Sequence, residues 1–128
     1  MFSHVTVGAD DLEASRRFYD AVLGALGVEP ASADPKGRYW WRTSRGAFAI
    51  TKPLDGQPAC GANGGTIGFM AKDADTVKAA HDAGVEAVCT SIEDPPGPRV
   101  GPFGPLELAY LRDPSGNKIC LMHRPKAD

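Results

Sequence analysis

The chain opens with alternating polar and apolar residues, after which its apolar residues recur at helical spacing. The alternation over residues 2–7 predicts a strand in which His4 faces away from Val5 and Val7. The next segment has one apolar stripe at a spacing of three or four residues, which predicts an amphipathic helix. The stripe is carried by Leu12, Phe18, Tyr19, Val22, Leu23 and Leu26.

Both ends of this predicted helix carry termination signals. Asp10 or Asp11 can cap its first turn, and with Asp10 as the cap Glu13 completes a capping box. Gly24 and Gly27 are expected to end the helix, because glycine readily adopts the conformation that follows a last helical turn.

The rest of the first half predicts a connector, two strands and a linker. Tyr39, Trp40 and Trp41 are adjacent in the first of these strands, so Trp40 is expected on the face opposite to Tyr39 and Trp41. The linker is rich in glycine and proline and has almost no strand or helix signal. The expected ranges are connector 28–37, strands 38–44 and 47–51, and linker 53–65.

The second half repeats this order at low identity. Asp73 is expected to cap a second helix that stops at Gly84. The remaining expected elements are strand 66–71, an extended segment 85–90, a Pro/Gly-rich loop 93–105, strand 106–112, turn 113–117 and strand 118–124. Two such units, each strand–helix–strands, predict a single α+β domain in which a curved mixed sheet surrounds a cleft with the helices outside. We expect module one at about 1–55 and module two at about 64–125.

Composition and charge exclude several classes of function. The formal net charge is −2, with basic and acidic residues mixed along the chain, so no basic stripe points to a nucleic acid partner. No apolar run approaches the ~20 residues of a membrane helix, and no secretory signal is visible, so we expect a cytoplasmic protein. The three cysteines, Cys60, Cys89 and Cys120, are scattered, which favours reduced thiols.

Two clusters of residues resemble one known family. The first is His4-Val5-Thr6-Val7 followed by Asp11-Leu12, Phe18-Tyr19 and Val22-Leu23-Gly24, and the second is the segment from Asp113 to Ile119, DPSGNKI. In both motifs and in the order of its elements, the chain resembles the vicinal oxygen chelate superfamily. That superfamily includes glyoxalase I, bleomycin-resistance proteins and extradiol dioxygenases. The resemblance covers nearly the whole chain and implies two βαβββ modules.

The resemblance also implies where a metal would bind. Metal-using members hold the ion with four side chains from the first and last strands of each unit. Carried over, these positions are His4, Ala49, Thr66 and Cys120, of which His4 is a standard ligand and Cys120 a thiol substitute. A divalent Zn, Ni or Fe ion at His4 and Cys120 would therefore have an incomplete site. His123 lies three residues beyond Cys120 and is expected on the opposite strand face.

The residues expected to line the cleft follow from the same resemblance. They are His4, which is also the candidate catalytic residue, and Thr6, Tyr39, Trp41, Ala49, Thr66, Met70, Cys120 and Met122. We expect a small organic ligand there and a homodimer. The alternatives are a metal-dependent lactoylglutathione-lyase-like or dioxygenase-like enzyme, and a non-catalytic homodimeric binding module. The 93–105 loop, with Arg99 and Phe103, is either a lid over the cleft or an ordinary surface loop.

Overall fold

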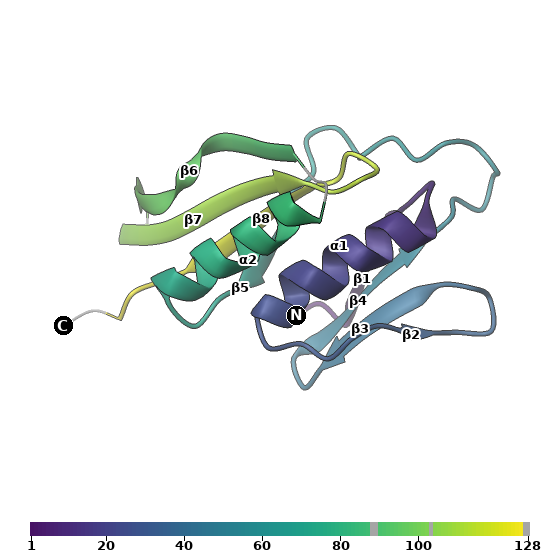
Figure 1. Ribbon diagram of the computed structural model, residues 1–128, viewed down its shortest axis with the longest axis horizontal. Helices are drawn as coiled ribbons and strands as arrows, with labels where there is room; N and C mark the ends of the chain where they lie inside the picture. The colour runs from purple at the N-terminus through teal and green to yellow at the C-terminus, as the bar shows by residue number, and fades with distance from the viewer. Residues whose placement is uncertain (88–89, 103, 127–128) are drawn as a thin grey trace.

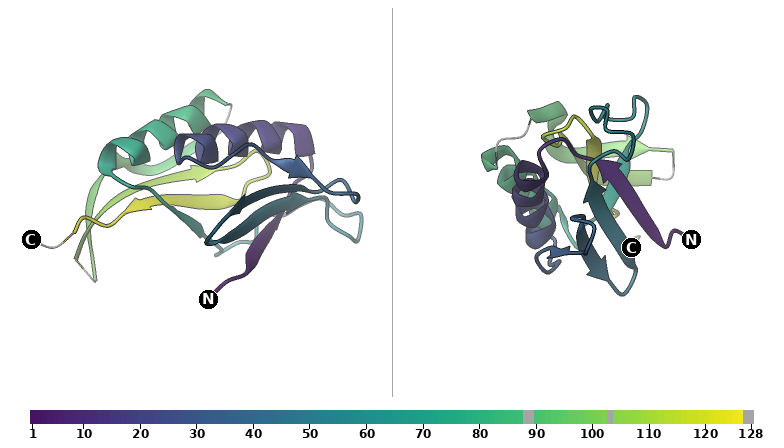
Figure 2. Two further views of the ribbon diagram at one scale, coloured as in Figure 1. Left: turned by 90° about the horizontal axis from the view of Figure 1, so that it is seen from below. Right: turned by 90° about the vertical axis from the view of Figure 1, so that its right-hand side faces the viewer.

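The structure is a computed structural model that describes residues 1–87, 90–102 and 104–126. It contains two four-stranded sheets with two helices packed side by side on one face (Figures 1 and 2). In chain order the elements are β1 (His4–Gly8), α1 (Leu12–Ala25), β2 (Ser32–Ala33), β3 (Tyr39–Thr43), β4 (Gly46–Thr51), β5 (Ile67–Met70), α2 (Ala74–Glu86), β6 (Thr90–Gly101), β7 (Gly104–Arg112) and β8 (Lys118–His123). The α+β class is confirmed, and the strands are divided between two sheets.

The two sheets have the same internal order. The first runs β1-β4-β3-β2 and the second β5-β8-β7-β6, with a parallel pair at the start of each. Thr6 pairs with Ala49 across β1 and β4, and Gly68 pairs with Cys120 across β5 and β8. Ala49 and Cys120 therefore occupy equivalent positions in the two halves, as the comparison of the sequences predicts.

Only one of the two candidate aspartates caps the first helix. Asp11 caps α1, because its Oδ1 accepts a hydrogen bond of 3.0 Å from the backbone N–H of Ala14. Asp10 instead accepts a hydrogen bond of 2.7 Å from the backbone N–H of Ala59 in the linker. Asp73 caps α2 as predicted, and its carboxylate accepts from the backbone N–H of Thr76.

One hydrophobic core joins the two halves of the chain. The ring of Tyr19 from α1 lies 4.7 Å from that of Phe48 on β4, and Phe48 in turn lies 5.2 Å from Phe69 on β5. At Gly84 of α2, a Cβ atom would lie 2.8 Å from Leu111 and 2.9 Å from Val22. The absence of a side chain at Gly84 thus permits the close approach of α2 to α1 and β7.

The glycine at position 84 does not end α2, which continues to Glu86, so the extended segment expected from residue 85 begins within the helix. Residues 88 and 89 of that segment, including Cys89, lie outside the described residues. The connector contains the short strand β2, which was not predicted. Its two residues pair with Trp40 and Tyr39 of β3, and this pairing is a long-range feature that a connector rich in proline and alanine does not signal.

The expectation of a loop over 93–105 is wrong. These residues form most of β6 and the start of β7, paired in an antiparallel hairpin with a shift of register between Ile92 and Gly97. The prolines fit because β6 is the edge strand of its sheet, where a missing backbone N–H removes no interior hydrogen bond. Arg99 donates to the carbonyls of Gly97 and Pro95 within the same strand, and Phe103 lies outside the described residues.

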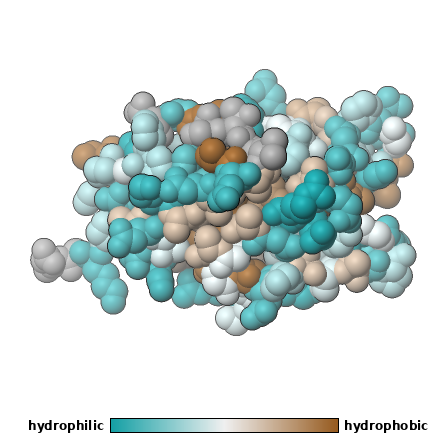
Figure 3. Space-filling view, viewed as in Figure 1, coloured by the Kyte–Doolittle hydropathy of each residue, from teal (hydrophilic) through white to brown (hydrophobic). Residues whose placement is uncertain are grey.

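Side chains on the helical face are mostly hydrophilic, with paler, more apolar side chains along the middle of the view (Figure 3). Within the described residues, neither helix is long and apolar enough to span a bilayer.

Candidate functional site

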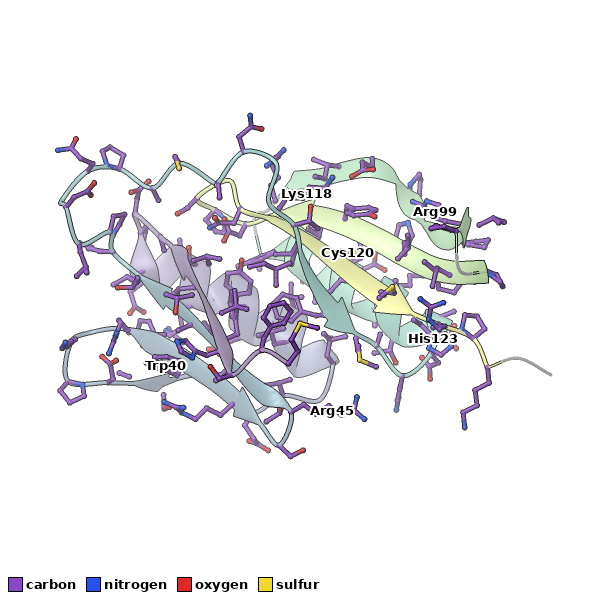
Figure 4. The ribbon with its side chains drawn as sticks, turned by 180° about the vertical axis from the view of Figure 1, so that it is seen from behind. Trp40, Arg45, Arg99, Lys118, Cys120 and His123 are labelled. Atoms are coloured by element: carbon purple, nitrogen blue, oxygen red, sulfur yellow. The ribbon has the colours of Figure 1, made fainter. Side chains whose placement is uncertain are left out.

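Each sheet has one face turned toward the helices and one face turned away, which we call the open face (Figures 2 and 4). In the first sheet, Val5 and Val7 pack against the core, so His4 and Thr6 lie on the open face, as predicted. Cross-strand pairing adds further residues to this open face, namely Ala47, Ala49, Trp40 and Arg42.

His4 is exposed on this open face and lies beside Trp40. The centroids of the two rings are 5.9 Å apart and the rings are inclined at 55°. The Nδ1 atom of His4 lies 2.8 Å from the hydroxyl of Ser3, which occupies one ring nitrogen and leaves Nε2 without a hydrogen-bond partner among the described residues. The free ring nitrogen can form a hydrogen bond with a ligand.

Trp40 is held in place by a carboxylate. Its indole N–H donates a 2.9 Å hydrogen bond to Oδ2 of Asp34, which also accepts 2.6 Å from Nε of Arg38. The bond from Trp40, followed by those from the backbone and side chain of Arg38, holds the pKa of Asp34 well below its ordinary value. The charged carboxylate therefore fixes the indole edge, and the ring remains available on the open face.

The other two aromatic residues of β3, Tyr39 and Trp41, lie on the face opposite to Trp40. Trp41 is 2% exposed and donates to Oδ1 of Asp20 in α1 at 2.9 Å. Tyr39 packs against the core, and its hydroxyl bonds to Glu13 of α1. The alternation between the three aromatic residues is as predicted, and the role of Tyr39 and Trp41 at a ligand site stays a prediction.

The open face of the second sheet contains a thiol, a phenol and an ion pair. Tyr110 pairs with Cys120 across β7 and β8, and Nζ of Lys118 lies 4.7 Å from the centroid of the Tyr110 ring. Lys118 also forms a 2.6 Å ion pair with Glu93 of β6. Met70 and Met122 pair with one another on the same face, and Met70 is 68% exposed.

The Cys120 thiol is not set up as a nucleophile. Burial raises its pKa, and the hydrogen bond with Tyr110, which lowers it, is the smaller influence. A raised pKa keeps the thiol protonated near neutral pH, whereas a reactive cysteine needs a stabilised thiolate. Burial also raises the pKa of Tyr110. These two groups therefore meet as neutral neighbours.

A cavity of about 490 Å³ opens where the first sheet meets β5. Its wall includes Phe2 just before β1, His4 of β1, Phe69 and Met70 of β5, and the core-facing Trp41 of β3. At its edge, the guanidinium of Arg45 lies 3.6 Å from the sulfur of Met70, so the turn between β3 and β4 reaches β5 (Figure 4). The cavity is of the size that holds a small organic molecule.

The sequence and the fold match known proteins over nearly the whole chain. A model of the glyoxalase/bleomycin resistance protein/dioxygenase superfamily matches residues 1–121. The chain belongs to this superfamily. A crystal structure of a glyoxalase/bleomycin resistance protein from Albidiferax ferrireducens T118 is 53% identical, with a TM-score of 0.94, and the match covers 97% of this chain and 99% of that one. No curated protein matches the chain.

More distant members of the superfamily share the fold. A glyoxalase-related enzyme from Fulvimarina pelagi is 18% identical, with a TM-score of 0.74, over 98% of this chain and 88% of that one. A lactoylglutathione lyase from Agrobacterium tumefaciens is 21% identical, with a TM-score of 0.65, over 95% of this chain and 92% of that one.

 Both likenesses concern the fold alone.

The donor set of this superfamily member does not fit the four-ligand metal site that the resemblance implies. The methyl group of Ala49 offers no donor atom, and Thr66, exposed just before β5, offers a neutral hydroxyl. His4 and Cys120 lie on different sheets, and the Cys120 thiol is held protonated. In the described part of the chain, no three His, Cys, Asp or Glu side chains are grouped so as to hold an ion. His123 faces the helix side, where Nδ1 lies 3.2 Å from the carbonyl of Ala71.

The residues predicted for the site thus fall into two groups. One group, on the first open face, contains His4, Thr6 and Ala49, and the other, on the second open face, contains Met70, Cys120 and Met122. Sequence reasoning missed Arg42, which lies two residues from Trp40 in β3, and Tyr110, which pairs with Cys120. The period of two along each strand places these residues beside the predicted ones once the strand pairing is known.

Proposed function

We propose that this protein binds a small organic ligand at the first open face and the adjoining cavity, without the four-ligand metal site of the metal-using members. The observation that carries the proposal is the pairing of the Trp40 ring with His4 above Ala47 and Ala49. His4 also lines the adjoining cavity of about 490 Å³, so the two rings offer an apolar surface and a polar group beside a space of ligand size. Ligand sites in proteins commonly combine an apolar lining with a few such polar groups.

The chemistry of the other predicted ligand positions supports a binding role over metal-assisted turnover. A catalytic metal usually requires at least three protein ligands, and the four carried-over positions supply one imidazole and one buried thiol. His4 remains the group available for proton transfer or for a hydrogen bond to the ligand.

We also expect the protein to act as a homodimer, as the resemblance to the family implies. Phe2 and Met70 border the cavity and are 74% and 68% exposed, so apolar surface lies next to the proposed ligand site. Coverage by a second copy would remove this surface from water. Size-exclusion chromatography with light scattering should give twice the 13.5 kDa mass of the chain, and a single-chain mass would exclude the dimer.

Tryptophan fluorescence tests the ligand site, because Trp40 and Trp41 are the two tryptophans of the chain. A panel of small aromatic compounds should include at least one that quenches the wild-type protein and the Trp41→Phe variant with the same affinity. The Trp40→Phe variant should lose this response. If no compound binds, the proposal fails. If Trp40→Phe responds and Trp41→Phe does not, the ligand lies in the cavity beside Trp41, and the open face around Trp40 is wrong as part of the site.

A further inference from the structure

The cavity of about 490 Å³ is apolar over most of its wall and polar at one end. The polar lining residues fall in two short stretches, 3–4 and 43–45. Thr43 pairs with Gly46 and His4 pairs with Ala47, so the two stretches meet at one end of the first sheet. The apolar wall comes from the end of α1, from β3 and β4, and from β5, and it includes Leu23, Leu26, Trp41, Phe48, Ile67 and Phe69.

Arg45 carries the one permanent charge among the described residues that line this cavity, since none of them is Asp, Glu or Lys. Its side chain is exposed and extends from the turn between β3 and β4 toward the second sheet (Figure 4), where the guanidinium lies 3.6 Å from the sulfur of Met70. A thioether sulfur is only a weak acceptor and carries no charge. Within the described part of the chain, no carboxylate forms an ion pair with Arg45. The polar end of the cavity therefore has a positive charge without a counter-charge.

We propose that the cavity binds apolar monocarboxylic acids, with the carboxylate on Arg45 and the body of the acid against the apolar wall. A carboxylate accepts two parallel hydrogen bonds from a guanidinium, which is a much stronger contact than the one with the Met70 thioether. A single cation matches one negative charge, whereas a phosphate monoester carries nearly two. This inference rests on the proposed function, because it assigns a chemical class of ligand to the cavity part of the same site.

The acid 4-phenylbutyrate and its neutral amide test the role of the charge, because the two compounds have nearly the same shape. Isothermal titration calorimetry of the intact chain should show the acid binding at least about tenfold more tightly than the amide. The Arg45→Gln variant should bind both compounds with the same affinity. Arg42→Gln is the matched control, since Arg42 is exposed on the same sheet but does not line the cavity, and it should keep the preference for the acid.

Gly68 allows the location of the acid to be tested. It lies in the wall of the cavity on β5, and a Cβ atom at this position would meet no atom within 4 Å. Gly68→Leu therefore adds a side chain to open space without crowding the core, and leucine is tolerated in a strand better than glycine. This variant should weaken the binding of both compounds at least about tenfold.

Three results would overturn the inference and leave the proposed function standing. The first is equal binding of acid and amide to the wild-type protein, and the second is a preference for the acid that survives in Arg45→Gln. The third is undiminished binding of the acid to Gly68→Leu, which would put the acid outside the cavity. If neither compound binds while the fluorescence panel yields a ligand, the acid class is wrong and the proposed function stands. If nothing in either experiment binds, both are wrong.

Discussion

The hydroxyl of Tyr19 donates a 2.6 Å hydrogen bond to Oδ2 of Asp113, across 94 positions of sequence. Tyr19 is fully buried in α1, and Asp113 is 4% exposed at the start of the turn between β7 and β8. Oδ1 of Asp113 accepts from the backbone N–H of Asn117, whose side chain donates to the carbonyl of Gly8 in β1 at 2.9 Å. The two motifs that carry the family resemblance thus meet here and join the two halves of the chain.

Removal of the Tyr19 hydroxyl should destabilise the fold. Tyr19→Phe leaves a buried carboxylate oxygen without one of its donors, and we expect the free energy of unfolding to fall by about 1–3 kcal/mol. Urea denaturation followed by circular dichroism measures this change.

Tyr39→Phe is the matched control, since it also removes a phenol hydroxyl that is bonded to a carboxylate. Its partner Glu13 has a side chain that is 52% exposed, so water can replace the lost donor. The expected loss is smaller than that of Tyr19→Phe, because the pair is open to solvent. Equal losses of unfolding free energy in the two variants would show that burial of the Tyr19–Asp113 pair adds nothing to stability.

Two glycines in the helices should respond to alanine in opposite directions. A Cβ at Gly84 would lie 2.8 Å from Leu111 and 3.0 Å from Phe18, so Gly84→Ala should cost about 1–2 kcal/mol despite the better helix propensity of alanine. A Cβ at Gly24 of α1 would meet no atom within 4 Å, and Gly24→Ala should stabilise by about 0.5–1 kcal/mol. Thermal unfolding of both variants checks this. A stabilised Gly84→Ala protein would contradict the close packing of the helices.

The Cys120 thiol should make the stability of the protein fall at alkaline pH. Burial raises its pKa in the folded state, so the unfolded chain loses this proton first as the pH rises. The contribution is fully present below the ordinary thiol pKa of about 8.5 and is lost as the pH passes through the folded value. Denaturation of wild type and Cys120→Ser between pH 7 and 10 should show a steeper fall for the wild type. Parallel curves would rule out a buried thiol.

Metal analysis should find no stoichiometric ion. The four carried-over positions offer one imidazole and one protonated thiol on separate sheets, so protein incubated with Zn, Ni or Fe and then desalted should retain well below one ion per chain. Elemental analysis by mass spectrometry gives the ratio. One bound ion per chain that is lost in both His4→Ala and Cys120→Ala would contradict this expectation.

Local sequence patterns predicted most of the helices and strands, but not which face of each strand turns toward the helices. The helix stripe and the alternation around His4 depend on near neighbours, and both are confirmed. The choice between Trp40 and Trp41 for the open face depends on the pairing of β3 with β4, where Trp41 is opposite Phe48. Phe48 contacts Tyr19 in the core, and this contact draws Trp41 to the helix side.

The edge position of β6 explains why residues 93–105 were wrongly expected to form a loop. Pro95, Pro96 and Pro98 indicate a loop when the segment is considered alone, since proline removes a backbone donor. Only the sheet order shows that β6 has a single strand neighbour and can tolerate prolines on its outer side. The position of Arg42 over Trp40 was equally hidden, because its pairing with Ala47 and its contact with the indole ring appear only in the folded chain.

The open face with His4 and Trp40 is proposed to bind a small organic ligand without a metal. The most direct measurement is the affinity of the tightest compound of the fluorescence panel, determined by isothermal titration calorimetry in the presence of EDTA and again with one equivalent of zinc. If the ligand site is independent of metal, each chain should have one site, and the affinity should be the same with EDTA and with zinc. Binding that disappears in EDTA and returns with zinc would contradict it.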